Sequence, residues 1–321
     1  MARYLGVDGG GSKTAFVLLD DAGRVLAEAR TASCYYFDEG IELVGRILTE
    51  GVSEVCRQAG VTTADIDQAF FGLPGYGEVS SDIVHLDALP RDVLGHDRFS
   101  CDNDMVCGWA GSLGAVDGIN VISGTGSMTY GERRGRGHRV GGWSELFGDE
   151  GSAYWIAARG LNTFTRMSDG RLPRGPLYDL MKTRVGITSD LDVIDVLVNE
   201  WKGQRALIAD LSKTVVDAAG HGDEASATIL REASGELVEI VEATRVALGF
   251  LDDEVVPVSY SGGMFTADAI RVGFEQALHT LPPAYELRVP IFGPAVGAAL
   301  YAAKQHGSPL AETALDRLGS R

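Results

Sequence analysis

The sequence predicts an α/β protein whose sheets combine parallel and antiparallel strands. Two observations support this fold class. A unit of strand, small-residue turn and strand occurs twice, about 115 residues apart, and helical segments follow each copy. Strands followed by helices, repeated twice, indicate an α/β architecture with mixed sheets. A duplication of this kind also predicts two domains with a nucleotide held between them.

The first domain is expected to cover residues 1–117. Its opening strands are joined by Asp-Ala-Gly, a sequence typical of hairpin turns, so they should form an antiparallel meander. Apolar residues at helical spacing then predict a helix over 41–59. The predicted strands are 3–8, 14–20, about 25–30, 69–73 and 98–101, and a further helix is predicted at 104–113.

The second domain is expected to cover residues 118–294 and to carry a helical insertion from 151 to about 250. A second meander begins at Gly118, and 223–248 is one long amphipathic segment. A strand at 255–260, a helix at 267–281 and a strand at 287–291 should follow. A closing helix at about 295–321 is expected to pack back on the first domain. The small residues at 293–299 suit either tight helix packing or a hinge.

A turn of three glycines joins the first two strands. Without Cβ atoms, its backbone N–H groups can approach an anionic ligand closely, which favours a phosphate-binding hairpin over a plain glycine hairpin. Gly6 and Gly11 have Walker A spacing, but Ser12 precedes Lys13 and a strand follows instead of a helix. Asp8 ends the first strand, where its carboxylate could hold Mg²⁺. The turn comprises Gly9, Gly10, Gly11, Ser12, Lys13 and Thr14.

The second small-residue turn repeats this plan between two apolar strands. Its hydroxyls and glycine backbone are donors suited to phosphate oxygens. The phosphate-binding candidates, after Ser123, are Gly124, Thr125, Gly126 and Ser127. Either turn alone is a weak signal, whereas the pair indicates a nucleotide site.

Two acids flank Asn103 between a predicted strand and a predicted helix. Asp102 or Asn103 suffices to cap the helix, so Asp104 is left for another role. Beside phosphate turns, a carboxylate there suits a general base that takes a proton from an attacking hydroxyl. The alternative is that Asp104 also serves as a cap.

Three further features suit ligand contacts. Gly142 and Trp143 place an indole on a turn, a surface suited to the apolar face of a sugar, although Trp143 could equally be core. Asp149 could accept hydrogen bonds from sugar hydroxyls or cap the next helix, a role also open to Glu150 or Ser152. After a strand, Gly262 and Gly263 would let the backbone approach a flat ligand such as adenine.

Composition excludes several classes of protein. The chain has 321 residues and a formal net charge of −17, which argues against nucleic acid or an anionic membrane as partner. No apolar run approaches the roughly 18 residues of a membrane span. We expect no signal peptide, a reducing cytoplasmic location, and four cysteines that act as small buried hydrophobes. A homodimer is expected.

The motifs at 8–14, 123–127, 141–143 and 148–157 resemble those of the N-acetylglucosamine kinase group of the BadF/BadG/BcrA/BcrD ATPases. This group belongs to the sugar kinase, Hsp70 and actin superfamily. The resemblance spans nearly the whole chain. It implies two RNase H-like domains of the actin/hexokinase type, with mixed sheets and ATP and Mg²⁺ in the cleft between them. It also implies an ATP-dependent sugar kinase acting on a hydroxyl of a hexosamine or N-acetylhexosamine.

The resemblance assigns roles within these motifs. It implies that Asp104 is the base, that Asp8 lies close to Mg²⁺, that the two turns hold phosphates, and that Gly262 and Gly263 lie by the adenosine. The residues expected to contact the sugar are Tyr35, Asn103, Asp104, Thr125, Gly142, Trp143 and Asp149.

One segment departs from the family pattern. Where those kinases have an asparagine that grips the sugar, this chain has Ser33–Phe37, with Tyr35 at about the asparagine position. An aromatic ring cannot replace the paired donor and acceptor of an amide. We therefore expect either weak use of N-acetylglucosamine or broad acceptance of sugars, unless Tyr35 points into the core.

Two other functions share this fold. ATPase activators of CoA-thioester dehydratases or reductases hold an iron–sulfur cluster through cysteines after the second phosphate turn, but no cysteine follows Cys107 here. The other is a non-catalytic sugar-binding regulator, which we do not expect, because no helix-turn-helix segment is expected before Tyr4 and the net charge of −17 is unsuited to DNA.

Overall fold

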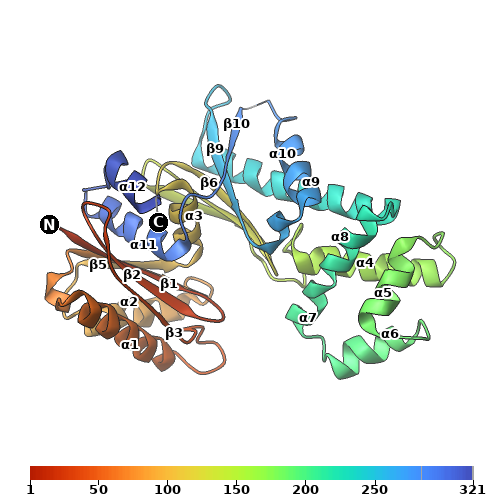
Figure 1. The fold of residues 1–321 in the computed structure, drawn as a ribbon, viewed down its shortest axis with the longest axis horizontal. Helices are drawn as coiled ribbons and strands as arrows, with labels where there is room; N and C mark the ends of the chain where they lie inside the picture. The colour runs from red at the N-terminus through yellow and green to blue at the C-terminus, as the bar shows by residue number, and fades with distance from the viewer. Residues whose placement is uncertain (283, 320–321) are drawn as a thin grey trace. The chain divides into compact units, whose positions relative to one another are not determined.

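The computed structural model describes residues 1–282 and 284–319. Position 283 of the expected second domain and positions 320–321 of the expected closing helix lie outside these ranges. The chain divides into two compact units (Figure 1). Unit 1 consists of Met1–Asp117 and Val289–Arg321, and unit 2 consists of Gly118–Arg288. The chain thus returns to unit 1 at Val289, whereas the sequence placed the return near 295.

Unit 1 is built on a five-stranded mixed sheet with the order β3-β2-β1-β4-β5. The predicted meander forms its antiparallel half, and β4 and β5 run parallel to β1. The strands are β1 (Arg3–Gly9), β2 (Thr14–Asp20), β3 (Val25–Thr31), β4 (Gln68–Leu73) and β5 (Phe99–Asn103).

Helices cover both faces of this sheet. On one face, α1 (Glu42–Ala59) and α2 (Ile83–Leu94) enclose an apolar core. On the other lie α3 (Met105–Leu113) and α11 (Pro294–Gln305), and α12 (Glu312–Gly319) ends the described chain. Helix α2, which carries Pro90 in its interior, was not predicted from the sequence. The single closing helix expected from 295 is two helices, α11 and α12.

Small residues let α11 lie directly on its neighbours. A Cβ placed on Gly6 of β1 would come 2.3 Å from the backbone nitrogen of Ala299. A Cβ on Gly297 would come 2.1 Å from the backbone nitrogen of Gly111 in α3. Such distances exclude any side chain, so the small residues at 293–299 serve close packing.

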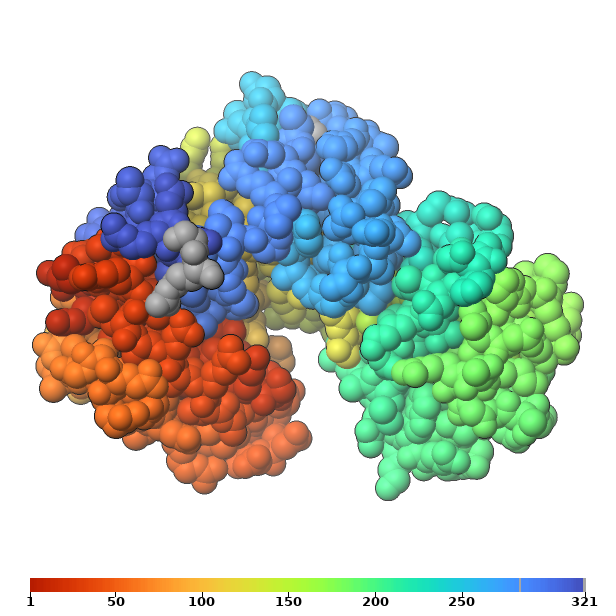
Figure 2. All heavy atoms as spheres, in the orientation of Figure 1, coloured from red at the N-terminus to blue at the C-terminus, as the bar shows by residue number. Residues whose placement is uncertain are grey.

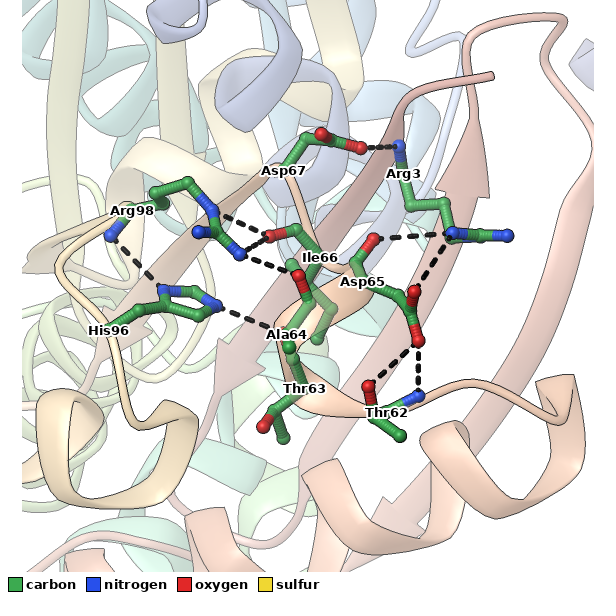
Figure 3. A network of polar contacts seen from close by, with 9 residues as sticks. All are labelled: Arg3, Thr62, Thr63, Ala64, Asp65, Ile66, Asp67, His96 and Arg98. Atoms are coloured by element: carbon green, nitrogen blue, oxygen red, sulfur yellow. Dashed lines mark hydrogen bonds and ion pairs between the residues drawn. The ribbon is translucent and has the colours of Figure 1, made fainter.

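A polar network joins the N-terminal ends of the parallel strands of unit 1 (Figure 3). The Arg3 backbone N–H donates to Asp67 Oδ2 at 2.8 Å, and Arg98 donates to the backbone oxygens of Ala64 and Ile66 at 2.8 and 2.9 Å. These bonds tie together the segments that enter β1, β4 and β5. The network therefore fixes the sheet at the end opposite to Asp8 and Asp102, and the strand ends that carry candidate residues stay free of it.

Unit 2 repeats the sheet plan of unit 1. Its order is β10-β9-β6-β7-β8, again with an antiparallel meander beside two parallel strands. This repeat confirms the duplication and the mixed sheets predicted from the two turns. The last strand lies at Tyr285–Arg288 instead of 287–291. The strands are β6 (Gly118–Ser123), β7 (Ser127–Arg133), β8 (Arg136–Gly141), β9 (Val256–Ser261) and β10 (Tyr285–Arg288).

Most of the helical insertion of unit 2 forms a packed lobe, drawn in green in the space-filling view, whereas its last and longest helix lies along β7 and β8 (Figures 1 and 2). Asp223 begins the long helix α9 by accepting a hydrogen bond from the Ser226 N–H. The α-helices of unit 2 are α4 (Ala153–Ser168), α5 (Pro176–Val185), α6 (Asp192–Asp195), α7 (Arg205–Asp210), α8 (Ser212–Gly220) and α9 (Glu224–Leu248) in the insertion, and α10 (Asp268–Leu278) after it.

Candidate active site

Asp8 and Asp104 lie close together at the C-terminal ends of the parallel strands of unit 1. Asp8 of β1 pairs in register with Gly72 of β4, and Gly72 pairs with Asp102 of β5. A Cβ on Gly72 would come 2.2 Å from Cys107 Sγ and 3.1 Å from Asp104 Cα. Because Gly72 has no side chain, the start of α3 can lie against β4, and Asp104 comes close enough to Asp8 for their charges to interact.

Both acids have raised pKa values. Burial, and then the neighbouring charge of Asp8, raise the pKa of Asp104 to about 7. Burial also raises the pKa of Asp8 to about 6, against the opposing effects of the Lys13 charge and a hydrogen bond from the Cys107 thiol. Two carboxyls whose surroundings disfavour ionisation are typical of a functional site. A cation beside them would relieve this repulsion.

The neighbours of Asp104 fill local structural roles. Asn103 is buried. Its Oδ1 accepts a hydrogen bond from the Met105 N–H, and its Nδ2 donates to the backbone oxygen of Tyr76, both at 3.2 Å. Asp102 Oδ1 accepts the Asn103 N–H at 2.7 Å. The N-cap position of α3 is Asp104, whose side chain makes no capping hydrogen bond, so neither predicted cap, Asp102 or Asn103, takes that place; Asn103 instead holds the turn before the helix. Its expected contact with the sugar would require the amide to give up these bonds or share them.

The glycine turn of unit 1 is closed by a hydrogen bond from the Gly10 N–H to the Lys13 oxygen at 2.9 Å. The strand β2 follows it, as predicted, so the loop is not a Walker A loop. Gly11, Ser12 and Lys13 are exposed, whereas Thr14 is fully buried. The Thr14 side chain hydrogen-bonds with the buried Cys34 thiol, so it is enclosed by the protein beneath the turn.

The aromatic segment that departs from the family pattern is attached to this turn. Ser33 Oγ donates to the Gly10 oxygen at 2.7 Å and accepts the Tyr35 N–H at 3.0 Å. Tyr35 is 39% exposed, and its ring meets Phe37 edge to face at 5.2 Å between centroids. Tyr35 therefore does not point into the core, and its ring is accessible beside the glycine turn.

The glycine turn of unit 2 is joined to the segment before α4. Ser123 Oγ donates to the backbone oxygen of Gly151 at 2.9 Å, and Ser127 Oγ donates to the backbone oxygen of Glu150 at 2.6 Å. These two hydroxyls hold protein backbone, so their protons are not directed at a ligand. Thr125 is exposed, and the glycine backbone on either side of it remains accessible.

A cavity of about 620 Å³ opens beside this turn within unit 2, a size typical of small-molecule sites. Gly124 and Thr125 line it together with Gly263 and residues of α7 and α8. Gly262 has φ +98°, and a Cβ there would come 2.2 Å from the backbone oxygen of Ser123. Only glycine fits at that point, so the turn after β9 can lie against the glycine turn of unit 2.

The tryptophan segment of unit 2, residues 141–155, presents the exposed ring of Trp143 and the buried acid Asp149. Trp143 is 69% exposed, so it is not a core residue. Asp149 is buried at φ +57°, accepts the Ser127 backbone N–H and forms an ion pair with Arg205. Burial raises the pKa of Asp149, and the Arg205 charge opposes this rise. Ser152, not Asp149, caps α4.

Sequence reasoning missed Arg205 and the cavity-lining residues of α7 and α8. They lie in the helical insertion, where no turn, glycine pair or motif distinguishes them from other amphipathic helix residues. Only their packing beside the glycine turn identifies them.

The donor set fits a weakly held hard cation better than a metal cage. Within residues 1–282 and 284–319, no three His, Cys, Asp or Glu side chains converge as metal ligands. Mg²⁺ is usually bound by one or two carboxylates together with substrate phosphates and water. The half-buried Asp8 carboxylate fits that role.

The strand order, repeated in both units, and the two glycine turns define a duplicated α/β ATPase. A profile of the BadF/BadG/BcrA/BcrD ATPase family matches residues 5–302. The chain belongs to this family, which confirms the resemblance found in the motifs.

Comparisons with individual proteins agree with this classification. The chain is 28% identical to N-acetyl-D-glucosamine kinase of Dictyostelium discoideum, covering 93% of this chain and 97% of that protein. It is 30% identical to N-acetylmuramic acid/N-acetylglucosamine kinase of Clostridium acetobutylicum, covering 82% and 85%. The crystal structure of a protein from Chromobacterium violaceum, proposed to be an N-acetylglucosamine kinase, has a TM-score of 0.66 at 27% identity, covering 94% and 98%.

Proposed function

We propose that this protein is an ATP-dependent sugar kinase that transfers the γ-phosphate to a hydroxyl of a hexosamine or N-acetylhexosamine. The observation that carries the proposal is Asp104, a carboxyl with a pKa of about 7 placed beside Asp8 at the ends of parallel strands. A base needs a pKa near the working pH. The names of the relatives in Dictyostelium and Clostridium support the same reaction and acceptor class.

The nucleotide is proposed to bind unit 2. Its adenosine would occupy the cavity beside Gly263, and its phosphates would follow the backbone of Gly124, Thr125 and Gly126. The glycine turn of unit 1, from Gly9 to Thr14 and including the exposed Lys13, would supply further phosphate contacts. Asp8 would hold Mg²⁺, which neutralises charge on the transferred phosphoryl group.

The proton is handled by Asp104. Its ionised carboxylate accepts the proton of the acceptor hydroxyl as that oxygen bonds to the γ-phosphorus and ADP leaves. Asp102 and Asp104 both accept backbone N–H groups, and Asp104 is preferred because it is the one that interacts with the charge of Asp8.

The acceptor is proposed to meet both rings and polar groups. The exposed faces of Tyr35 and Trp143 suit the apolar side of a pyranose ring. Gly142 and Asp149 are proposed to contact it from the tryptophan segment, and Asn103 from the start of α3. Asp149 would then keep its ion pair with Arg205 while accepting a sugar hydroxyl.

The setting is proposed from the sequence. Among the described helices, none is long and apolar enough to cross a membrane. We propose that the enzyme works in the cytoplasm as a homodimer, with no nucleic-acid partner. Sedimentation equilibrium tests the oligomeric state.

A screen of acceptors tests the activity. ADP release from MgATP is measured with a panel of amino sugars, N-acetylated amino sugars, neutral hexoses and sugar acids. Release that depends on at least one amino sugar supports the proposal. ADP release that no member of the panel stimulates would refute it.

A further inference from the structure

Arg205 is a cation of unit 2 held by two acids of the tryptophan segment. It is the first residue of α7, the helix whose next residue, Ala206, lines the cavity. Its Nε contacts Glu145 Oε2 at 3.1 Å, and its Nη2 pairs with Asp149. Its side chain is 42% exposed. In the described structure these two carboxylates are its acceptors, so part of its five-donor guanidinium is left for a ligand.

The guanidinium lies directly on the glycine turn of unit 2. A Cβ placed on Gly126 would come 2.6 Å from Arg205 Nη2 and 2.7 Å from Asp149 Oδ2. Gly126 is thus glycine because the ion pair occupies the space of its side chain. The preceding residues of the same turn, Gly124 and Thr125, line the cavity. The turn therefore leads from the cavity to Arg205.

The turn lies among acidic side chains, so an anionic phosphate can bind there only with a cation beside it. Asp149 is buried beside the turn, and the negative charges of Glu145 and Glu150 both act on it. A polyphosphate brought to Gly126 would meet the Asp149 carboxylate unless a positive group stood beside it. Lys213 also lines the cavity, but it pairs with Asp210. Arginine is well suited here, because its planar fork can bind carboxylate and phosphate oxygens together.

We propose that Arg205 contacts the terminal phosphates of the nucleotide while it remains paired with Asp149. This inference rests on the proposed function, because it takes the cavity as the adenosine site. It assigns Arg205 to the phosphate end of the ligand, with no part in recognition of the base. Its contribution must therefore grow with the number of phosphates.

The test compares the binding of AMP, ADP and ATP to Arg205→Met by isothermal titration calorimetry in the presence of Mg²⁺. A charged hydrogen bond of ordinary strength predicts that ATP binds roughly 10- to 100-fold more weakly, ADP less so, and AMP within about twofold of the parent. Arg205→Lys should recover part of the loss. Arg159→Met is the matched control, since Arg159 pairs with Glu232 on helices of the same unit and should leave all three affinities unchanged.

A second variant separates direct contact from an indirect effect. In Arg205→Met the Asp149 carboxylate is left unpaired, so the double variant Arg205→Met/Asp149→Asn removes that charge too. Direct contact predicts that ATP stays weak in the double variant. Recovery of ATP affinity there, or an equal loss for AMP, ADP and ATP, would overturn the proposal, as would unchanged ATP binding to folded Arg205→Met.

The two proposals fail in different ways. If the parent protein binds no nucleotide, the proposed function falls. If it binds ATP and phosphorylates a sugar while Arg205→Met keeps full ATP affinity, only the role of Arg205 falls.

Discussion

At the scale of single residues, position decides which of two neighbouring acids can react. Asp102 and Asp104 are both carboxyls whose pKa burial raises. Asp102 accepts the Asn103 N–H, whereas Asp104 interacts with the charge of Asp8 across the side-chain-free position of Gly72. The sequence offered Asp102 or Asn103 as the cap and Asp104 as a ligand group or a further cap, and it could not show that α3 has Asp104 at its N-cap position without a side-chain capping bond.

Replacing Asp104 tests this distinction. Asp104→Asn keeps the shape of the side chain but removes the proton acceptor, so turnover should fall about 10²- to 10⁴-fold. ATP and sugar affinities should change little. Asp102→Asn, the matched control, should keep turnover within about tenfold. Steady-state kinetics with calorimetric binding check both variants, and turnover of Asp104→Asn within about threefold of the parent would remove Asp104 from its role.

The pKa of Asp104 also sets a pH dependence. Its ordinary value of 3.8 is raised to about 7, so below pH 7 the carboxyl is mostly protonated and cannot accept a proton. kcat/KM should therefore fall as the pH is lowered through about 7, by roughly tenfold per unit at the acid end. A kcat/KM profile that is flat between pH 5 and 8 would contradict the assignment of an acid with this pKa as base.

At the scale of elements, periodicity and turn chemistry predicted most of the fold. The meander, α1, α9 and the two glycine turns were predicted within a few residues because each has a strong local pattern. Helix α2 was missed because Pro90 argues against a helix interior, and its place on the sheet is set by packing. The end of unit 2 was misplaced because strand β10 has only four residues.

The turn after β9 gives a prediction at this scale. At Gly262, alanine would need φ +98° and a Cβ 2.2 Å from the Ser123 oxygen, so the variant should lose about 1–3 kcal/mol of unfolding free energy. At Gly263, a Cβ meets no atom within 4 Å, so alanine there should change stability by less than about 0.5 kcal/mol. Denaturant unfolding measures both, and equal stability of the two variants would contradict this account of Gly262.

At the scale of the whole molecule, the duplicated sheet plan and family membership follow from motifs far apart in the chain. The sequence located both glycine turns, but it could not supply the cavity, because its walls include residues of α7, α8 and the turn after β9. Nor could it supply the Arg205–Asp149 pair, since 56 residues separate the partners. Side chains that meet only after folding carry no local signal.

The choice of acceptor is a prediction for the whole enzyme. Tyr35 is exposed beside the glycine turn and offers a ring and one hydroxyl in place of the two polar groups of an amide. A site that selects by shape discriminates modestly. We therefore expect N-acetylglucosamine to be a poor substrate or one of several accepted sugars, and Tyr35→Asn to favour it. The measurement is kcat/KM for N-acetylglucosamine, glucosamine and glucose in both proteins; a parent preference for N-acetylglucosamine of a thousandfold or more would contradict this expectation.

The destination of the γ-phosphate tests the central claim most directly. Phosphorus NMR follows MgATP with the parent protein, with and without the best amino-sugar acceptor. The account predicts a sugar phosphate ester formed in a one-to-one ratio with ADP, and little inorganic phosphate when sugar is absent. Inorganic phosphate formed at the same rate with and without sugar, and no sugar ester, would contradict it and show an ATPase that transfers nothing to a sugar.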